Sequence, residues 1–213
     1  MDFVITGGAG FIGSHIAEQL VNSGHNVTII DNLSNGKKEN LDAIMNKIKF
    51  INGDIRDFEL LKKTCENIDE VFHQAALASV QESFLKEQEY HDVNVKGTEN
   101  IFKIANELNF KVVYASSSSI YGNPEKIPIK ESDQKNPINP YAITKLDDEE
   151  LAKKYADMGV RIIGLRYFNV FGEKQSSTYA GVIKKFVKKV RCNEAPVING
   201  DGQQTRDFVY VGD

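Results

Sequence analysis

The sequence contains only two cysteines in 213 residues, Cys65 and Cys192, which lie far apart in the chain. Neither has a second cysteine or a histidine at the spacing of a zinc site, and the four histidines form no ligand pattern either. This scarcity excludes a disulfide framework and indicates two reduced thiols. We therefore predict a cytoplasmic protein without a metal site.

Neither a basic excess nor a long apolar run is present. The chain has 26 basic and 30 acidic residues, for a net charge of −4, so it has no positive field to attract nucleic acid or an anionic membrane. No apolar run approaches the roughly 18 residues needed to span a bilayer. Because an apolar strand starts almost at Met1, we also expect no signal peptide. We predict no nucleic-acid partner and no membrane partner.

Glycines are concentrated in the segment Thr6–Gly13. A short apolar run, Phe3–Ile5, precedes this segment, a helix-period pattern follows it, and a second apolar run, Val27–Ile30, ends at Asp31. Strand, glycine turn, helix and acidic strand end are typical of a dinucleotide site. The glycines allow a tight turn and close approach of a pyrophosphate to the helix N-terminus. Asp31 would accept hydrogen bonds from ribose hydroxyls, which favours NAD over NADP.

Strand-like and helix-like segments alternate along the rest of the chain. This alternation predicts an α/β fold, a Rossmann-type doubly wound parallel sheet with helices on both faces. Ligands in such sheets bind at the carboxyl ends of the strands. We expect strands at 3–5, 27–30, 47–51, 70–73, 111–115, 160–165 and 208–211, and helices at 16–21, 58–65, 93–108, 140–158 and 182–190.

A possible acid–base group follows the strand at 111–115. Serines occupy positions 116–119, and Tyr141 and Lys145 lie one turn apart on the next helix, which places phenol and ammonium on one face. Free tyrosine titrates near 10, and a lowering of about three pKa units requires roughly 4 kcal/mol of interaction with the nearby ammonium. A serine hydroxyl could share the proton with a substrate oxygen. Each motif is common by chance, and their order along the chain is what makes them specific.

Taken together, these motifs resemble the extended short-chain dehydrogenases/reductases of the NAD-dependent epimerase/dehydratase family. Within that family the chain most resembles UDP-glucose and UDP-N-acetylglucosamine 4-epimerases. The resemblance extends over nearly the whole chain, through the segments Thr6–Gly13, Asp31–Gly36, Gly53–Asp57, His73–Ala76, Asn94–Thr98, Ser116–Gly122, Pro140–Lys145, Leu165–Gly172 and Thr205–Asp207.

The resemblance implies roles for individual residues. Tyr141 would be the base, Lys145 would tune it and hold the nicotinamide ribose, and Ser117 would be the hydroxyl partner. Asn169 and Arg206, with Ser117 and Tyr141, would bind the substrate, the first two at its diphosphate. The implied cofactor is NAD, bound by Gly7, Gly10, Phe11, Ile12, Gly13, Asp31, Asn32, Leu33, Ser34, Asn35, Gly36, Asp54, Ile55, Gln74, Ala75, Ala76, Ala78, Asn94, Tyr141, Lys145 and Phe168.

The sequence also departs from some branches of this family. Sugar 4,6-dehydratases carry an Asp-Glu pair where this chain has Ser118 and Ser119, and decarboxylases usually carry a Glu at the second position, so both reactions are disfavoured. Ala78 replaces the lysine of some UDP-galactose 4-epimerases, which points to a branch that accepts N-acetylated or uronic sugars. Family members continue past Asp213. We therefore expect an NAD-binding domain at 1–166 and part of a small substrate-binding lobe at 167–213.

The leading hypothesis is a nucleotide-sugar 4-epimerase that oxidises C4 of a UDP-sugar transiently with NAD and forms a homodimer, as its relatives often do. Two alternatives stay open. One is another NAD-dependent nucleotide-sugar oxidoreductase of the same family. The other is a truncated NAD-binding domain without turnover. The sequence does not specify which sugar is epimerised.

Overall fold

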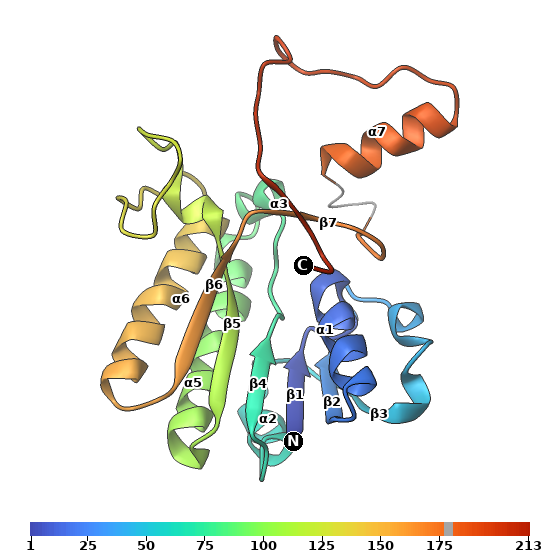
Figure 1. Cartoon of the computed structure of the whole chain (residues 1–213). Helices are drawn as coiled ribbons and strands as arrows, with labels where there is room; N and C mark the ends of the chain where they lie inside the picture. The colour runs from blue at the N-terminus through green and yellow to red at the C-terminus, as the bar shows by residue number, and fades with distance from the viewer. Residues whose placement is uncertain (177–180) are drawn as a thin grey trace. The chain divides into compact units, whose positions relative to one another are not determined.

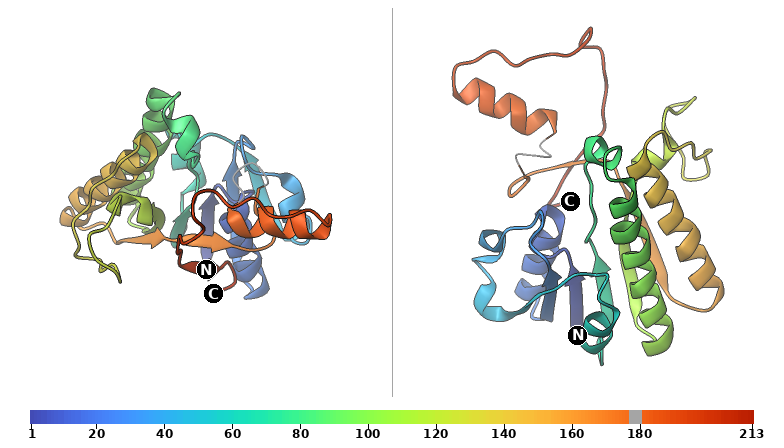
Figure 2. Two further views of the ribbon diagram at one scale, coloured as in Figure 1. Left: turned by 90° about the horizontal axis from the view of Figure 1, so that it is seen from above. Right: turned by 180° about the vertical axis from the view of Figure 1, so that it is seen from behind.

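The computed structural model describes residues 1–176 and 181–213 and divides into two compact units, Met1–Tyr167 and Phe168–Asp213. Figures 1 and 2 show the helices and strands of both, and each unit is described by itself. The first unit contains the strands β1 (Asp2–Thr6), β2 (Asn26–Asp31), β3 (Ile48–Asn52), β4 (Glu70–His73), β5 (Lys111–Ser117) and β6 (Ile162–Tyr167). Its α-helices are α1 (Phe11–Asn22), α2 (Phe58–Thr64), α3 (Val80–Ser83), α4 (Glu87–Tyr90), α5 (Gly97–Leu108) and α6 (Pro140–Asp157).

The six strands form one parallel sheet in the order β3-β2-β1-β4-β5-β6 (Figure 1). This order confirms the predicted Rossmann-type sheet. The strand order switches between β1 and β4, which run parallel with Thr6 paired to His73, because the chain adds β2 and β3 on one side of β1 and β4 to β6 on the other. The segments that leave these two strands therefore border a crevice at the carboxyl edge, which is where ligands bind in open parallel sheets.

Two apolar cores lie on opposite faces of the sheet, because successive side chains of a strand point to opposite faces. Val4 packs into the core under α2, α5 and α6, whose largest buried members include Phe102 and Tyr155. Ile5, the next residue, packs into the core under α1 with Ile29. The ring of Phe102 makes edge contacts with Tyr114 at a centroid distance of 5.5 Å. Strands buried on both faces explain the continuous apolar runs in the sequence.

The helix predicted at 93–108 is part of a longer helical segment, and its first residues are not α-helical. α5 begins only at Gly97, and the π-helical turn η3 (His91–Lys96) joins it to α4. A π-turn accommodates one extra residue, and such turns are frequent at functional sites. Asn94 lies in this turn with its side chain fully buried. The remaining short helices are η1 (Lys38–Leu41), η2 (Met45–Lys47) and η4 (Ser118–Tyr121).

The second unit contains β7 (Asn169–Phe171), α7 (Val182–Arg191) and β8 (Phe208–Tyr210). β7 and β8 form a parallel pair, and the Phe171 ring packs against the rings of Phe208 and Tyr210. α7 carries basic side chains in its last turn, as expected from the pattern at 182–190. Within residues 1–176 and 181–213, no helix has the length and apolar character to cross a bilayer.

Candidate functional site

A cleft opens at the crevice between β1 and β4 of the first unit. Residues singled out from the sequence supply most of its lining: Gly7, Gly10, Asp31, Asn32, Ser34, Asn35, Gly36, Asp54, Ile55, Gln74, Ala75 and Ala76. Sequence reasoning did not assign a role to the others: Ile30, Gly53, Arg56, Leu77, Glu89 and Val93. Gly53 and Arg56 flank the assigned pair Asp54-Ile55, whereas no sequence signal pointed to Glu89.

Glycine is required at two points of the turn after β1. Gly7 has a φ of +69°, and a Cβ there would lie 2.6 Å from the backbone nitrogen of Ala75, where the chain leaves β4. A Cβ on Gly13, in the first turn of α1, would lie 2.3 Å from the carbonyl oxygen of Gly7. No side-chain rotation relieves either clash, because both neighbours are backbone atoms. The start of α1 is thus held close to the cleft, with unpaired N–H groups in its first turn.

The carboxylate of Asp31, at the end of β2, faces this turn. Its Oδ2 accepts a hydrogen bond from Ala9 N at 2.9 Å, and its Oδ1 accepts one from Leu33 N at 2.8 Å. Burial raises the pKa of Asp31, and these two N–H groups lower it in part. Each carboxylate oxygen can accept a second hydrogen bond. Asp31 therefore fixes the turn and still has acceptor capacity in the cleft.

Asp54 is paired with a residue that sequence reasoning left without a role. Arg56 donates to both of its carboxylate oxygens, at 2.9 and 2.7 Å, and Asn32 Nδ2 donates to Oδ2 at 3.1 Å. Hydrogen bonds from Arg56 lower the pKa of Asp54 to about 2, so its carboxylate stays ionised across the physiological range. This fork-shaped pair orients the Asp54 carboxylate where it lines the cleft.

Gln74 is the first residue after β4, and it lines the cleft. Its Nε2 is buried, and the Tyr167 hydroxyl is the hydrogen-bonding neighbour of its side chain. An amide NH₂ group has two N–H donors, so Gln74 can donate to Tyr167 and also to a ligand in the cleft that it lines.

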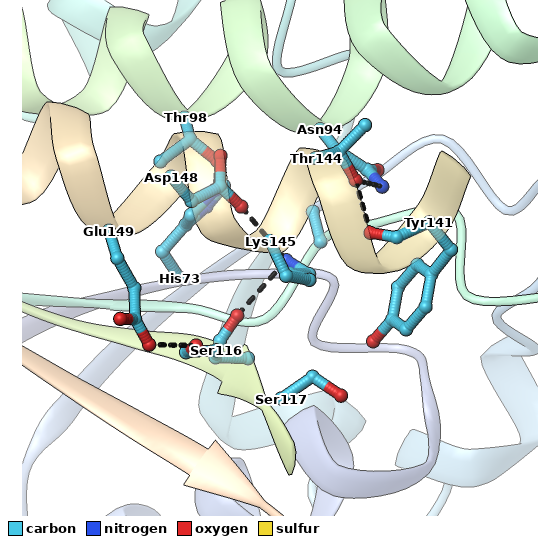
Figure 3. A network of polar contacts seen from close by, with 12 residues as sticks. His73, Asn94, Thr98, Ser116, Ser117, Tyr141, Thr144, Lys145, Asp148 and Glu149 are labelled. Atoms are coloured by element: carbon cyan, nitrogen blue, oxygen red, sulfur yellow. Dashed lines mark hydrogen bonds and ion pairs between the residues drawn. The ribbon is translucent and has the colours of Figure 1, made fainter. Parts of the chain in front are cut away.

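A second group of predicted residues lies where β5 meets α6 (Figure 3). Ser117 ends β5, and its Oγ accepts hydrogen bonds from Ser119 N at 3.1 Å and Ser119 Oγ at 2.8 Å, which leaves its own hydroxyl proton to donate. α6 begins at Pro140, and Asn139 caps it by accepting from Ala142 N at 2.8 Å. Tyr141 is therefore in the first turn of α6. Figure 3 shows its hydroxyl directed toward the side where Ser117 lies.

Lys145 is almost fully buried beneath Tyr141. Its Nζ donates to the carbonyl oxygen of Ala115 at 3.0 Å, which links α6 to β5 two residues before Ser117. Nζ also donates to Oδ2 of Asp148 at 3.1 Å. Sequence reasoning placed Lys145 beside Tyr141 but did not identify Asp148. An acidic residue within a run of four acidic residues gives no signal of burial.

His73 lies deeper, at the end of β4. Its Nδ1 is 2.6 Å from Thr6 Oγ1, and its Nε2 is 2.9 Å from Thr98 Oγ1. Burial, together with the charge of Lys145, lowers the pKa of His73 to about 3, so the imidazole is neutral. His73 is thus a hydrogen-bonded core histidine that connects β1 to α5.

Asn94 connects the cleft to the Tyr141 group. Its Oδ1 accepts from Leu77 N at 2.8 Å, and its Nδ2 donates to Leu77 O and to Thr144 Oγ1, both at 3.0 Å. Leu77 lines the cleft, and Thr144 Oγ1 donates to the carbonyl oxygen of Tyr141 at 2.8 Å. One buried side chain therefore fixes the cleft wall relative to the first turn of α6.

The other predicted residues have separate positions. Leu33, with a φ of +59°, lies beside Asp31, and Phe11 and Ile12 are in the first turn of α1. These three do not line the cleft, and neither does Ala78, which is exposed. Phe168, Asn169 and Arg206 belong to the second unit, as does Asp207, whose carbonyl oxygen accepts from Asn169 Nδ2 at 2.9 Å. The β7–β8 pairing thus brings Asn169 near the Arg206 segment.

The two groups of side chains have complementary chemistry. The cleft offers a helix start, an amide and a buried carboxylate, which are suited to phosphates and hydroxyls. Ser117 and Tyr141 offer two hydroxyls that can exchange a proton with a substrate oxygen, beside a buried ammonium.

Comparison with known proteins gives consistent matches. A family model described as the NAD dependent epimerase/dehydratase family matches residues 3–213. A putative UDP-glucose 4-epimerase of Methanocaldococcus jannaschii is 43% identical over 99% of this chain and 70% of its own length. A UDP-N-acetyl-alpha-D-glucosaminuronate decarboxylase of Bacillus cytotoxicus is 39% identical, over 99% of this chain and 67% of its own. Among solved structures, UDP-N-acetylglucosamine 4-epimerase from Methanobrevibacter ruminantium, in complex with UDP-N-acetylmuramic acid, matches with a TM-score of 0.94 and 43% identity, over 99% of this chain and 69% of that one.

Proposed function

The chain belongs to the NAD-dependent epimerase/dehydratase family, and we propose that it epimerises a UDP-sugar at C4 with NAD as the bound oxidant. The proposal agrees with the similarity to UDP-sugar 4-epimerases over 99% of the chain. In this proposal the first unit binds the dinucleotide, and residues of the second unit supply part of the binding site for the sugar nucleotide.

The residues of the cleft fit NAD. A Cβ on Gly7 or Gly13 would collide with backbone, and this close approach keeps the start of α1 open to a pyrophosphate. Asp31 has acceptor capacity for ribose hydroxyls, and Gln74, which lines the cleft, offers an amide donor. When bound, NAD would supply a reversible two-electron oxidation of the sugar at C4.

One observation carries the proposed chemistry: Tyr141 and Ser117 share a site with the buried Lys145, and Asn94 fixes this site relative to the cleft. Tyr141 would take the proton of the sugar O4 hydroxyl and return it after the sugar has turned over. Ser117, whose hydroxyl proton is free to donate, would hold O4 during both transfers. The ammonium of Lys145 would stabilise negative charge on the Tyr141 oxygen.

The remaining assignments are part of the same proposal. Asn169 and Arg206 would bind the diphosphate of the substrate, Arg206 by charge-assisted hydrogen bonds, and Phe168 would lie near the nicotinamide. A homodimer and a cytoplasmic location remain predictions from the sequence. The alternative is another NAD-dependent oxidoreductase that acts on a UDP-sugar, which the 39% identity to a decarboxylase keeps open.

The experiment measures product formation by the purified 213-residue chain with NAD and, in turn, UDP-galactose, UDP-N-acetylgalactosamine and UDP-glucuronate. We expect the 4-epimer of at least one sugar and no decarboxylated product. Tyr141→Phe should lower turnover by about a thousandfold and leave NAD bound, because the proton acceptor is lost while the other cofactor-binding residues remain. Tyr155→Phe removes a hydroxyl from the same helix, 3.5 Å from Glu99, and should turn over normally. Full activity of Tyr141→Phe would contradict the proposal.

A further inference from the structure

Asp148 is a buried charge that the proposed chemistry does not use directly. It lies on α6 three residues after Lys145, and its side chain is 0% exposed. Its Oδ2 accepts from Lys145 Nζ at 3.1 Å, and the Thr98 hydroxyl on α5 is a second hydrogen-bonding neighbour of the carboxylate. Buried ion pairs rarely stabilise a fold more than apolar side chains of the same size would. A carboxylate in this position therefore points to a role in the site.

The hydrogen bonds of Lys145 suggest that role. An ammonium has three N–H donors and no acceptor. One donor is used by the carbonyl oxygen of Ala115 and one by Asp148, which leaves a single donor for the site. In Figure 3, Lys145 lies between Asp148 and Tyr141, so the carboxylate holds the ammonium from the side away from the phenol.

The groups that face Asp148 from the neighbouring elements are mostly uncharged. His73 on β4 is neutral, because burial lowers its pKa to about 3. Tyr114 on β5 is neutral as well, because burial and the charges of Glu149 and Asp148 raise its pKa. Thr98 on α5 contributes a hydroxyl beside Asp148 (Figure 3). From α6 itself come the ammonium of Lys145 and the charge of Asp147.

We infer that Asp148 is a positioning residue for Lys145: its carboxylate and the Ala115 carbonyl hold two of the three Nζ donors and direct the third at the bound cofactor and Tyr141. This inference rests on the proposed function. It identifies Asp148 as the residue that sets the position of the ammonium, and therefore the rate of the proton transfer.

A pH dependence follows from this arrangement. Burial raises the pKa of Asp148 to about 6, although the charge and hydrogen bond of Lys145 lower it. Above about pH 6 the carboxylate is ionised and holds the ammonium; below that pH it is protonated, and its attraction for the ammonium is lost. Both turnover and NAD affinity should therefore rise with pH through a single proton step near 6.

The test compares Asp148→Asn with Asp147→Asn, which removes the same charge from the adjacent position of α6. We measure kcat and KM for the UDP-sugar and the Kd of NAD between pH 5 and 8.5. In Asp148→Asn we expect kcat at pH 8 to fall at least tenfold, the step near pH 6 to disappear, and the KM for UDP-sugar to change less than twofold. Asp147→Asn should keep both the rate and the step. Wild-type kcat with the step intact in Asp148→Asn would overturn the inference.

Two further measurements keep the inference testable. If Asp148→Asn does not fold, the pH dependence of NAD affinity is compared between the wild-type chain and Lys145→Met. The step near pH 6 should be present in the first and absent from the second, and its absence from the wild type would overturn the inference. If the wild type converts no UDP-sugar, the proposed function fails, whereas the NAD affinities still decide the role of Asp148.

Discussion

Replacement of Gly13 by alanine tests how tightly α1 is held against the glycine turn. The new Cβ would lie 2.3 Å from Gly7 O and 2.9 Å from Gly8 Cα, both backbone atoms, and to regain an ordinary contact of 3.4 Å the helix start must move by about 1 Å. Overpacking of this kind costs about 1–3 kcal/mol. The first-turn N–H groups would move with the helix, so we expect NAD affinity to fall at least tenfold, about 1.4 kcal/mol.

The assay pairs NAD titration calorimetry with thermal unfolding. For a chain of this length, each kcal/mol should lower Tm by about 2–4 °C. Gly181→Ala is the control for NAD affinity, because Gly181 has an ordinary φ of −62° and a Cβ there would meet no atom of the described residues within 4 Å. Wild-type NAD affinity and Tm in Gly13→Ala would refute the reasoning, since they would show that α1 shifts freely away from the turn.

Two further predictions concern the buried polar side chains around the site. Asn94→Ala removes the hydrogen bonds of its side chain to Leu77 N, Leu77 O and Thr144 Oγ1. It should therefore lower the free energy of unfolding by about 1–3 kcal/mol and slow turnover. An unchanged urea midpoint would contradict this prediction. Burial would raise the pKa of Glu149, but hydrogen bonds from Arg166, Lys135 and Ser116 lower it to about 2. The stabilisation from this carboxylate is therefore complete above about pH 4.5 and lost as pH falls towards 2. Glu149→Gln should be less stable than wild type by about 1.5–3 kcal/mol at pH 7, with a difference that shrinks below pH 4.5; a constant difference would count against the ion pair.

The sheet and the cleft were predictable because local patterns determine them. The turn at Thr6–Gly13 has its strand, glycines and helix within a short stretch, and Asp31 ends the next strand. The parallel strands are buried on both faces, so each appears as an apolar run that bounds one element. The residues that follow these runs line the cleft because all carboxyl ends meet at one edge of the sheet.

The interior of α6 was not predictable in the same way. The middle of its buried face carries Thr144, Lys145 and Asp148, all polar, so the apolar stripe that reveals which side faces the core is interrupted there. The run Asp147–Glu150 appears solvent-exposed in the sequence, yet Asp148 is buried because it lies one turn from Lys145 on the inner face. The π-turn His91–Lys96 was also missed, since one extra residue in a helix leaves the local propensities unchanged.

The most direct test of the central claim follows the substrate's own C4 deuterium. The UDP-sugar that the chain converts is deuterated at C4 and incubated in ordinary water with the purified chain, one equivalent of NAD and no other oxidant, and the product is analysed by NMR. The account predicts a 4-epimer that retains deuterium at C4, because C4 is oxidised and reduced within one bound complex. A 4-epimer without deuterium at C4 would contradict it, and so would a product that has lost the C4 deuterium and is not the 4-epimer.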